Sequence, residues 1–390
     1  MVLSRNPMRR SILIVPFVSV LHISAAAPAA TETITLADMM RGIKMTQEQC
    51  AALPAAVWIN AMGRSYCMRY YLSTFGGDEL YPVVFLSGDR LGRLNTRTGA
   101  WFERSVGGID TANLSRLADR LSRQAKVPAI YLARVGLDGS SGDHRVRHTV
   151  LELHATNAAL NAIKQRHNFK GFHLIGHSGG AGLVAGLIAL RDDVGCAVIG
   201  AGRLDQKFAP RPGGRELQSF NPADSIPAIL RKSVATRIVV ITDPADKKVP
   251  AHTQTSFVRK LRQAGKQIEQ YVVQSTEQER HDVTPYARLA VADCIRGANA
   301  QELAQDIRDL VDQRMGAVRA NPTVETVATP NPPVSAIPRQ PIAAGDPKPK
   351  PTSRETSPAQ APAPKSTVAV PAVTTLQTDK PASAAARARE

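Results

Sequence analysis

The chain of 390 residues has few aromatic residues, few cysteines and few long apolar runs. Aromatic residues make up 5% of the chain, and its basic residues are scattered rather than interleaved with aromatics, so we expect no stacking surface for single-stranded nucleic acid. None of the four cysteines lies in a C-x-x-C pair or beside histidines at zinc spacing, which argues against a metal site. Beyond the N-terminal segment, no apolar run is long enough to cross a bilayer.

The overall composition is that of a globular protein, but the composition of the two terminal segments differs from that of the middle of the chain. Hydrophobic residues make up 43% of the chain and the net charge is +16. This charge permits weak attraction to anionic surfaces, although a solvated basic surface explains the scattered positions better. We divide the chain into a targeting segment at 1–29, a folded domain at 30–317 and a low-complexity tail at 318–390.

The targeting segment has the features of a secretory signal peptide. Basic residues precede an apolar stretch, and small residues follow it: Arg5, Arg9 and Arg10, then Ile12–Ile23, then Ala27-Pro28-Ala29 as an A-x-A cleavage site. An uncleaved N-terminal anchor is the alternative. We therefore expect an exported protein, periplasmic or secreted, with no membrane span after cleavage.

An even number of cysteines in an exported chain suggests two disulfides. Of the three connectivities, we favour Cys50 with Cys67, because both lie in one N-terminal segment. The other pair, Cys196 with Cys294, would tie the start of a core strand to a late helix. Buried free thiols are the alternative.

Short apolar runs alternate with helical patterns through the folded domain. We expect strands at Tyr81–Leu86, Pro128–Ala133, Gly171–Ile175, Cys196–Gly200, Arg237–Thr242 and Gln270–Gln274. Helices are expected at Thr111–Gln124 (with Thr111 as cap), Val150–His167, Ala181–Leu190, Thr253–Ala264, Pro285–Ile295 and Ala300–Met315. Thr31–Tyr70 is expected to hold short helices or early edge strands. This alternation predicts an α/β fold with a doubly wound, mostly parallel central sheet and helices on both faces. Gln206–Asp224 is too short for a large cap domain.

The most informative stretch is G-H-S-G-G at residues 176–180, between a predicted strand and a predicted helix. A G-x-S-x-G pattern in this context predicts a nucleophile elbow that presents Ser178 at the end of the sheet. Gly176 and Gly180 would let strand and helix approach closely. His177 would shape the elbow, and the N–H of Gly179 would face an oxyanion. A glycine-rich turn without chemistry is the alternative.

A catalytic serine needs a histidine base and an acid that orients it. Only two of the nine histidines follow the serine, and His281 lies in the loop after the last predicted strand, where the base belongs. His252 is better explained as a surface or cap residue. Asp243 and Asp246 both follow the preceding strand, and either could reach the base. The second oxyanion donor would be the N–H of Asp89, in the loop after the first strand.

From about Tyr81 to Met315, the chain resembles α/β-hydrolases, in particular prolyl-oligopeptidase-like and dienelactone-hydrolase-like members. The resemblance rests on FLSGD at 85–89, the GHSGG elbow, NPADSI at 221–226, DKKVP at 246–250 and His281. The family pattern H-G-x-x-D-x-x-V-P implies that Asp246 is the acid and that Asp243 stands where glycine is usual.

Two positions depart from that pattern. Ser87-Gly88 replaces the usual His-Gly, so the oxyanion corner is expected to be built differently. Asp282 follows His281, where small residues are common. The loop Gly139–His144 stands where peptidase-like relatives have a glycine-rich loop, so the resemblance implies that Asp143 and His144 line the pocket.

The tail is rich in Pro, Ala, Thr, Ser and Lys and cannot bury enough apolar surface to fold. It is either an arm that binds anionic cell-wall material weakly or a tolerated appendage.

For the whole chain we expect an exported serine hydrolase that cleaves an ester or amide of a small molecule or peptide, without a cofactor. Esterase and peptidase are not separable here. The alternative is a catalytically silent binding protein with the same fold and a basic, wall-associating tail.

Overall fold

A computed structural model describes residues 32–90, 109–205, 214–232 and 236–320. The predicted signal peptide and the tail beyond residue 320 lie outside these residues, as does the first part of Gln206–Asp224.

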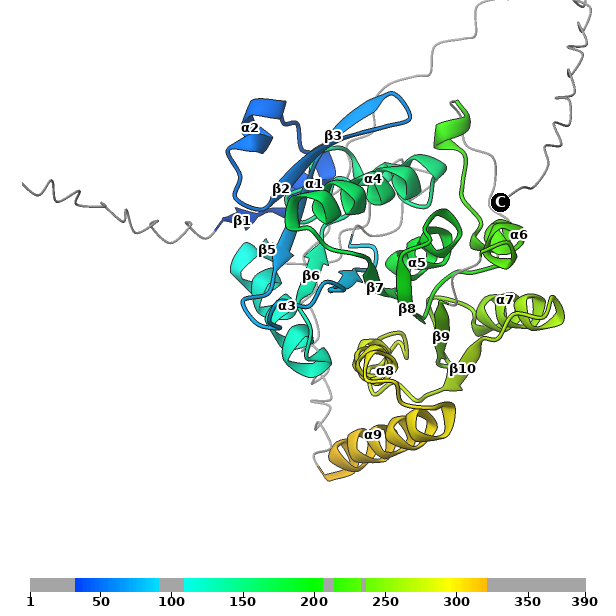
Figure 1. Cartoon of the computed structure of the whole chain (residues 1–390). Helices are drawn as coiled ribbons and strands as arrows, with labels where there is room; N and C mark the ends of the chain where they lie inside the picture. Colours follow the sequence, from blue (N-terminus) through cyan, green and yellow to red (C-terminus); the bar gives the residue numbers. More distant parts are fainter. Residues whose placement is uncertain (1–31, 91–108, 206–213, 233–235, 321–390) are drawn as a thin grey trace, which may run out of the picture. The chain divides into compact units, whose positions relative to one another are not determined.

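An eight-stranded sheet forms the centre of the domain (Figure 1). Its order is β10-β9-β8-β7-β4-β6-β3-β2, and pairing is parallel from β10 to β6. The strands are β2 (Ala56–Ala61), β3 (Arg64–Leu72), β4 (Val83–Leu86), β6 (Ala129–Leu132), β7 (Phe172–His177), β8 (Val194–Gly200), β9 (Arg237–Thr242) and β10 (Glu269–Val272). Parallel pairing brings the carboxyl ends of β4 and β6 to β10 to one edge of the sheet, where ligand sites of such folds form.

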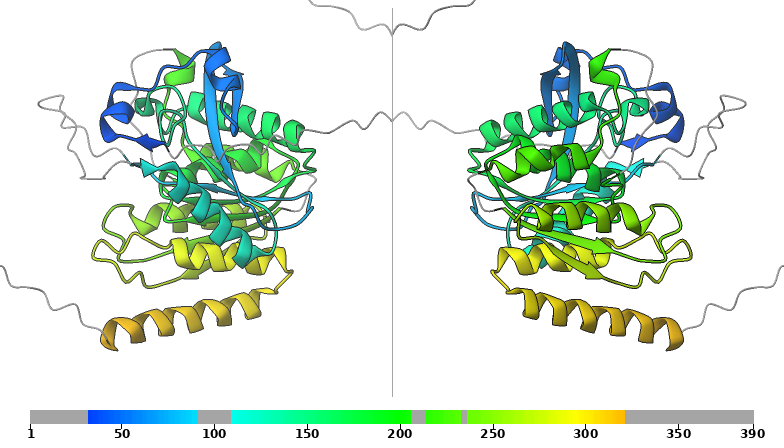
Figure 2. Two further views of the ribbon diagram at one scale, coloured as in Figure 1. Left: turned by 90° about the vertical axis from the view of Figure 1, so that its left-hand side faces the viewer. Right: turned by 90° about the vertical axis from the view of Figure 1, so that its right-hand side faces the viewer.

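Helices cover both faces of the sheet, as Figures 1 and 2 show. One apolar core packs α4, α5, α6 and α7 against the sheet, and another packs α3, α8 and α9. The helices are α1 (Leu36–Arg41), α2 (Gln47–Ala51), α3 (Thr111–Ala125), α4 (Val150–His167), α5 (Gly179–Leu190), α6 (Ile226–Leu230), α7 (Ala251–Gln263), α8 (Thr284–Ile295) and α9 (Ala300–Ala320). Helix α5 is apolar on all sides, as expected for a helix that is buried from Gly179 to Ile188.

The predicted fold class is confirmed, and the N-terminal segment is now defined. Strands β2 and β3 form an antiparallel hairpin, and β3 pairs antiparallel with β6 at one end of the sheet. A separate pair joins β1 (Thr33–Ile34) to β5 (Ile109–Asp110). The described part of the segment between β8 and β9 holds only two 3₁₀ turns and α6, in keeping with the absence of a large cap.

Two predicted details are corrected. Helix α3 is capped by Asp110 rather than Thr111, because the Asp110 carboxylate accepts the N–H of Ala112 at 2.8 Å. Helix α9 continues to Ala320, five residues beyond the predicted end at Met315. Among the described residues, no helix is both long and apolar enough to cross a membrane.

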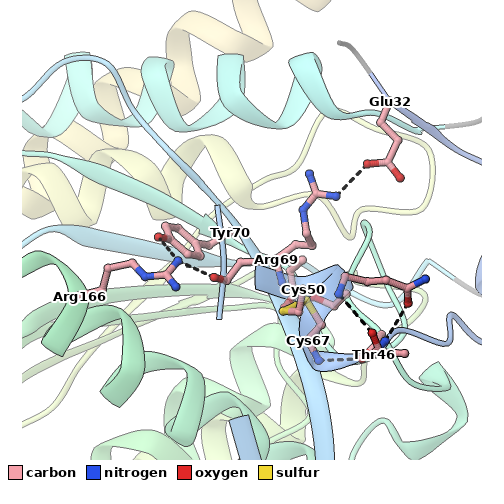
Figure 3. Close-up of a disulfide and its surroundings, with 12 residues drawn as sticks. Glu32, Thr46, Cys50, Cys67, Arg69, Tyr70 and Arg166 are labelled. Carbon is pink, nitrogen blue, oxygen red and sulfur yellow. Dashed lines mark hydrogen bonds and ion pairs between the residues drawn. A yellow bond between two sulfur atoms is a disulfide. The ribbon is translucent and has the colours of Figure 1, made fainter. Parts of the chain in front are cut away.

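Both favoured disulfides, Cys50–Cys67 and Cys196–Cys294, are present. Figure 3 shows the first, which ties α2 to β3. Beside it, the buried Arg69 binds Glu32 at 2.8 Å, and Arg166 of α4 donates to the backbone carbonyl of Ala56 on β2 (Figure 3). These contacts fix the edge hairpin to the rest of the domain.

Candidate active site

Ser178 stands at a sharp turn between β7 and α5. Its backbone has φ 54° and ψ −117°, a conformation that costs a residue with a Cβ about 1–3 kcal/mol. Its N–H donates to the carbonyl of Gly200 on β8 at 2.9 Å, which holds the turn against the sheet. Such a strained serine at a strand-to-helix turn is the geometry of a nucleophile elbow.

The glycines of the elbow are required by close backbone contacts. A Cβ at Gly176 would lie 2.5 Å from the carbonyl oxygen of Gly180, and one at Gly180 would lie 2.2 Å from that of Leu86. Neither neighbour is a flexible side chain that could move aside. Strand β7, helix α5 and the end of β4 can therefore meet here only with glycine at both positions.

His281 and Asp246 are paired across two loops at this edge of the sheet. The Nδ1 atom of His281 lies 2.8 Å from Oδ2 of Asp246, whose side chain is completely buried. The other carboxylate oxygen accepts the N–H groups of Lys248 and Val249 at 2.8 and 2.9 Å. With Nδ1–H donated to the carboxylate, Nε2 of a neutral His281 is the basic nitrogen.

His177 connects the elbow to the loop that carries His281. Its Nε2 lies 3.0 Å from the carbonyl oxygen of His281, and the two rings are 4.9 Å apart. Burial lowers the pKa of His177, and the neighbouring His281 lowers it further, which favours a neutral ring that donates through Nε2–H. The residue next to Ser178 thus holds the His281 loop against the elbow.

The two alternatives left by the sequence are separated by their contacts. Asp243 binds Arg280 rather than a histidine, so Asp246 is the carboxylate that faces His281. His252 is exposed in the first turn of α7.

The loop after β4 lies directly against the elbow. A Cβ at Gly88 would lie 3.0 Å from Cβ of Ser178, and a Cβ at Gly179 would lie 2.3 Å from Oδ1 of Asp89. The residues expected to supply the two oxyanion donors, Gly179 and Asp89, are therefore in contact. The carboxylate of Asp89 also lies at this corner, which the sequence did not suggest.

The Asp89 carboxylate is surrounded by basic side chains from the loops after β6. Arg134 and His148 each approach it to 2.7 Å, and Arg147 lies at 3.4 Å. Burial alone would raise the pKa of Asp89, but the positive charges of His148 and Arg134 and its hydrogen bonds outweigh burial and hold that pKa well below its usual range. The carboxylate therefore stays ionised.

Arg134 is anchored behind Asp89 by a second carboxylate. Its side chain is completely buried and lies 2.8 Å from Glu152 of α4, which is also completely buried. Its Nη1 also donates to the carbonyl of Ser87 at 3.2 Å. One guanidinium therefore holds both the backbone and the side chain of the loop that contacts Ser178.

The expectation that His144 lines the pocket is wrong. His144 has no exposed surface, because its Nδ1 contacts the carbonyl of Val135 at 3.1 Å and its Nε2 faces Asp89 at 3.6 Å. Burial lowers its pKa. Asp143 is partly exposed and binds Arg145 while capping the short 3₁₀ turn at His144–Val146.

Arg134, His148 and Glu152 were missed because no motif spacing joins them to the elbow. One signal was present in the sequence: Arg134 directly follows a predicted buried strand, at the same edge as Asp89. Glu152 stands between Leu151 and Leu153 on a predicted apolar helix and had no evident partner. Among the described residues, no group of His, Cys, Asp and Glu could hold a metal ion.

No protein-family model matches the chain, and no curated protein matches it. Among solved structures, an esterase of Pyrococcus furiosus is similar, with a TM-score of 0.43 and 14% identity over 65% of this chain and 96% of that chain. A putative dienelactone hydrolase of Klebsiella pneumoniae has a TM-score of 0.41 and 17% identity over 68% of this chain and 97% of that chain.

An acylaminoacyl peptidase of Pyrococcus horikoshii has a TM-score of 0.41 and 11% identity over 62% of this chain and 40% of that chain. At such low identities and TM-scores, these similarities do not indicate a reaction or a substrate, which must be inferred from the chain's own residues. By its strand order, its two helical layers and the strained serine between β7 and α5, the chain has the α/β-hydrolase fold.

Proposed function

We propose that the protein is an exported serine hydrolase that cleaves an ester or amide bond through an acyl-enzyme intermediate. The observation that carries the proposal is the strained Ser178 at the elbow, whose neighbour His177 contacts His281, together with the bond from Nδ1 of His281 to Asp246, which leaves Nε2 to act as the base. A serine hydroxyl is a weak nucleophile until such a base removes its proton.

In the proposed reaction, Oγ of Ser178 attacks the carbonyl carbon while Nε2 of His281 takes its proton. The Asp246 carboxylate keeps the imidazole in the correct tautomer and stabilises the imidazolium. The N–H groups of Gly179 and Asp89 stabilise the oxyanion of the tetrahedral intermediate. His281 then gives its proton to the leaving alcohol or amine, and water removes the acyl group by the same steps.

Export is part of this proposal. It is supported by the signal-peptide features of the first 29 residues and by the two disulfides, which are typical of oxidising compartments. N-terminal sequencing of the protein recovered from the producing cell's periplasm or medium should give a chain that begins at about Ala30. A cytoplasmic protein that retains Met1 would contradict export.

The enzyme class is tested by offering the mature protein activated acyl esters and aminoacyl anilides of varied chain length. We expect at least one series to be hydrolysed at a rate that Ser178→Ala reduces to the uncatalysed background. Turnover of esters alone would assign an esterase, and turnover of anilides a peptidase. Equal rates for the wild type and Ser178→Ala would reject the serine mechanism.

A further inference from the structure

Asp243 has four hydrogen bonds and no exposed side-chain surface. Its Oδ2 accepts from Nε of Arg280 at 2.8 Å and its Oδ1 from Nη2 of the same guanidinium at 3.0 Å. The remaining bonds come from the N–H of Ser275 at 2.7 Å and that of Ala245 at 2.9 Å. Bidentate, charge-assisted bonds of this kind are among the strongest in proteins.

Arg280 directly precedes His281 in the loop between β10 and α8. Its backbone has φ 56°, an uncommon left-handed conformation for a side-chain-bearing residue. The bidentate bond to Asp243 holds Arg280 in this conformation, and the direction of the next residue depends on it. The backbone of His281 is held in the same loop by Glu277, whose carboxylate accepts the His281 N–H at 2.6 Å.

The Asp243–Arg280 pair joins the two loops that carry Asp246 and His281. Asp243 directly follows β9, three residues before Asp246, whereas Ser275 and Arg280 belong to the loop after β10. A backbone hydrogen bond from Lys247 to Glu279 at 2.9 Å also connects the loops. The buried carboxylate is therefore placed where it can set the distance between the acid and the base.

We propose that Asp243 and Arg280 are positioning residues for the His281–Asp246 pair. This inference rests on the proposed function and adds two residues to it. It also gives a reason for a carboxylate at the position where similar hydrolases usually have glycine. A displacement of about 1 Å between catalytic groups costs on the order of 100-fold in rate, so a bond that fixes the distance between these two loops would have a large kinetic effect.

The chain contains a matched control pair at the other end of β9. Arg237 and Glu269 also form a bidentate arginine–carboxylate bond, at 2.7 and 3.0 Å. Arg237 begins β9 and Glu269 begins β10, so this pair joins the same two strands at the edge opposite to Ser178. A purely structural role would make both pairs equivalent.

The experiment compares Arg280→Gln, Asp243→Asn and their double variant with Glu269→Gln in the mature protein. Arg280→Gln is the primary variant, because its side chain is 26% exposed and Asp243 keeps its two backbone donors. Two readouts are used: the second-order rate of labelling by a fluorophosphonate, and the low-field proton resonance of the His281 Nδ1–H that is bonded to Asp246.

We expect Arg280→Gln to slow labelling by about 10- to 100-fold and to shift or broaden the resonance. The double variant should be no slower than the worse single variant, because the two residues act as one unit. Arg280→Lys, which keeps the charge but not the bidentate bond, should lie between. Glu269→Gln should leave both readouts at the wild-type value. Unchanged labelling and resonance in folded Arg280→Gln would overturn the positioning role.

The resonance separates this inference from the proposed function. If the wild type is not labelled, the hydrolase proposal fails, but the resonance still tests the positioning role. Its loss in Arg280→Gln and retention in Glu269→Gln would support the positioning role, and its retention in both would overturn it.

Discussion

The loops on the two sides of the elbow each carry a carboxylate, completely buried for Asp246 and partly exposed for Asp89, and the two have different surroundings. On the side of the proposed base, Asp246 faces one histidine and two backbone N–H groups. On the side of the proposed oxyanion donors, Asp89 faces Arg134, His148 and Arg147. A carboxylate with a single titratable partner can orient and stabilise that partner during proton transfer. One that is compensated by several cations is fixed in charge and serves to hold the loop around it.

Removal of the proposed base is expected to have the largest effect. His281→Ala should lower kcat by about 10⁴-fold or more, because Ser178 would lose the base that the proposal assigns to it. His252→Ala is the control, since its side chain is exposed on α7 and should leave kcat unchanged. The measurement is steady-state hydrolysis of whichever ester or anilide the mature protein cleaves. Similar losses from both variants would contradict the assignment.

Replacing each carboxylate by its amide tests the comparison directly. Asp246→Asn should lower kcat by about 10⁴-fold with little effect on folding, because an amide favours the wrong tautomer of His281. Asp89→Asn should cost far less in kcat, since the Asp89 N–H remains, but should lower the free energy of unfolding. Kinetics and denaturant unfolding of both variants decide this. Equal kinetic losses would remove the distinction between the two sides.

The contact between Gly179 and Asp89 allows a finer test. Gly179→Ala would place a Cβ 2.3 Å from Oδ1 of Asp89 and displace the oxyanion corner, so we expect kcat to fall by about 100-fold. Gly182→Ala on the same helix is the control, because its Cβ would meet nothing closer than 3.6 Å. If Gly179→Ala retained full kcat, the oxyanion corner would have to lie elsewhere.

The smallest expected effect concerns acid stability. The pKa of Asp89 is lower in the folded than in the unfolded protein, so its contribution is complete above the unfolded value of about 4 and is lost as pH falls through the lower folded value. Asp89→Asn should therefore be less stable than the wild type at neutral pH, and the difference should shrink below about pH 4. Urea unfolding across this range measures it. A difference that is constant with pH would contradict the low pKa.

The pairing of Asp246 with His281 could be predicted from the sequence, whereas the charges around Asp89 could not. Asp246 and His281 follow consecutive strands and lie in a recognisable D-x-x-V-P and loop context, so local pattern placed them together. Arg134 and Glu152 are 45 and 63 positions from Asp89, and their pairing depends on how β4, β6 and α4 pack. Because packing brings these charges together, the sequence places Arg134 at the edge where Asp89 lies but does not show that the two residues pair.

Some elements of the fold could likewise be predicted from the sequence, and others could not. The strand Arg237–Thr242 and the helix Val150–His167 were predicted at their observed bounds, because the residues that indicate each element are neighbours in the sequence. The β2–β3 hairpin was not resolved into strands, because its strand character depends on pairing with β6. Asp243 is an example. In the sequence it was a candidate for the acid that orients His281, and its contact with Arg280 became evident only in the structure.

The site of fluorophosphonate attachment tests whether Ser178 is an activated nucleophile. The mature protein and its Ser178→Ala variant would be incubated with the probe, and the modified peptide would be identified by mass spectrometry. We predict a single adduct on Ser178, absent from the variant and slowed by Asp246→Asn. A folded wild-type protein that carries no adduct would contradict an activated nucleophile and would favour a silent binding protein with the same fold.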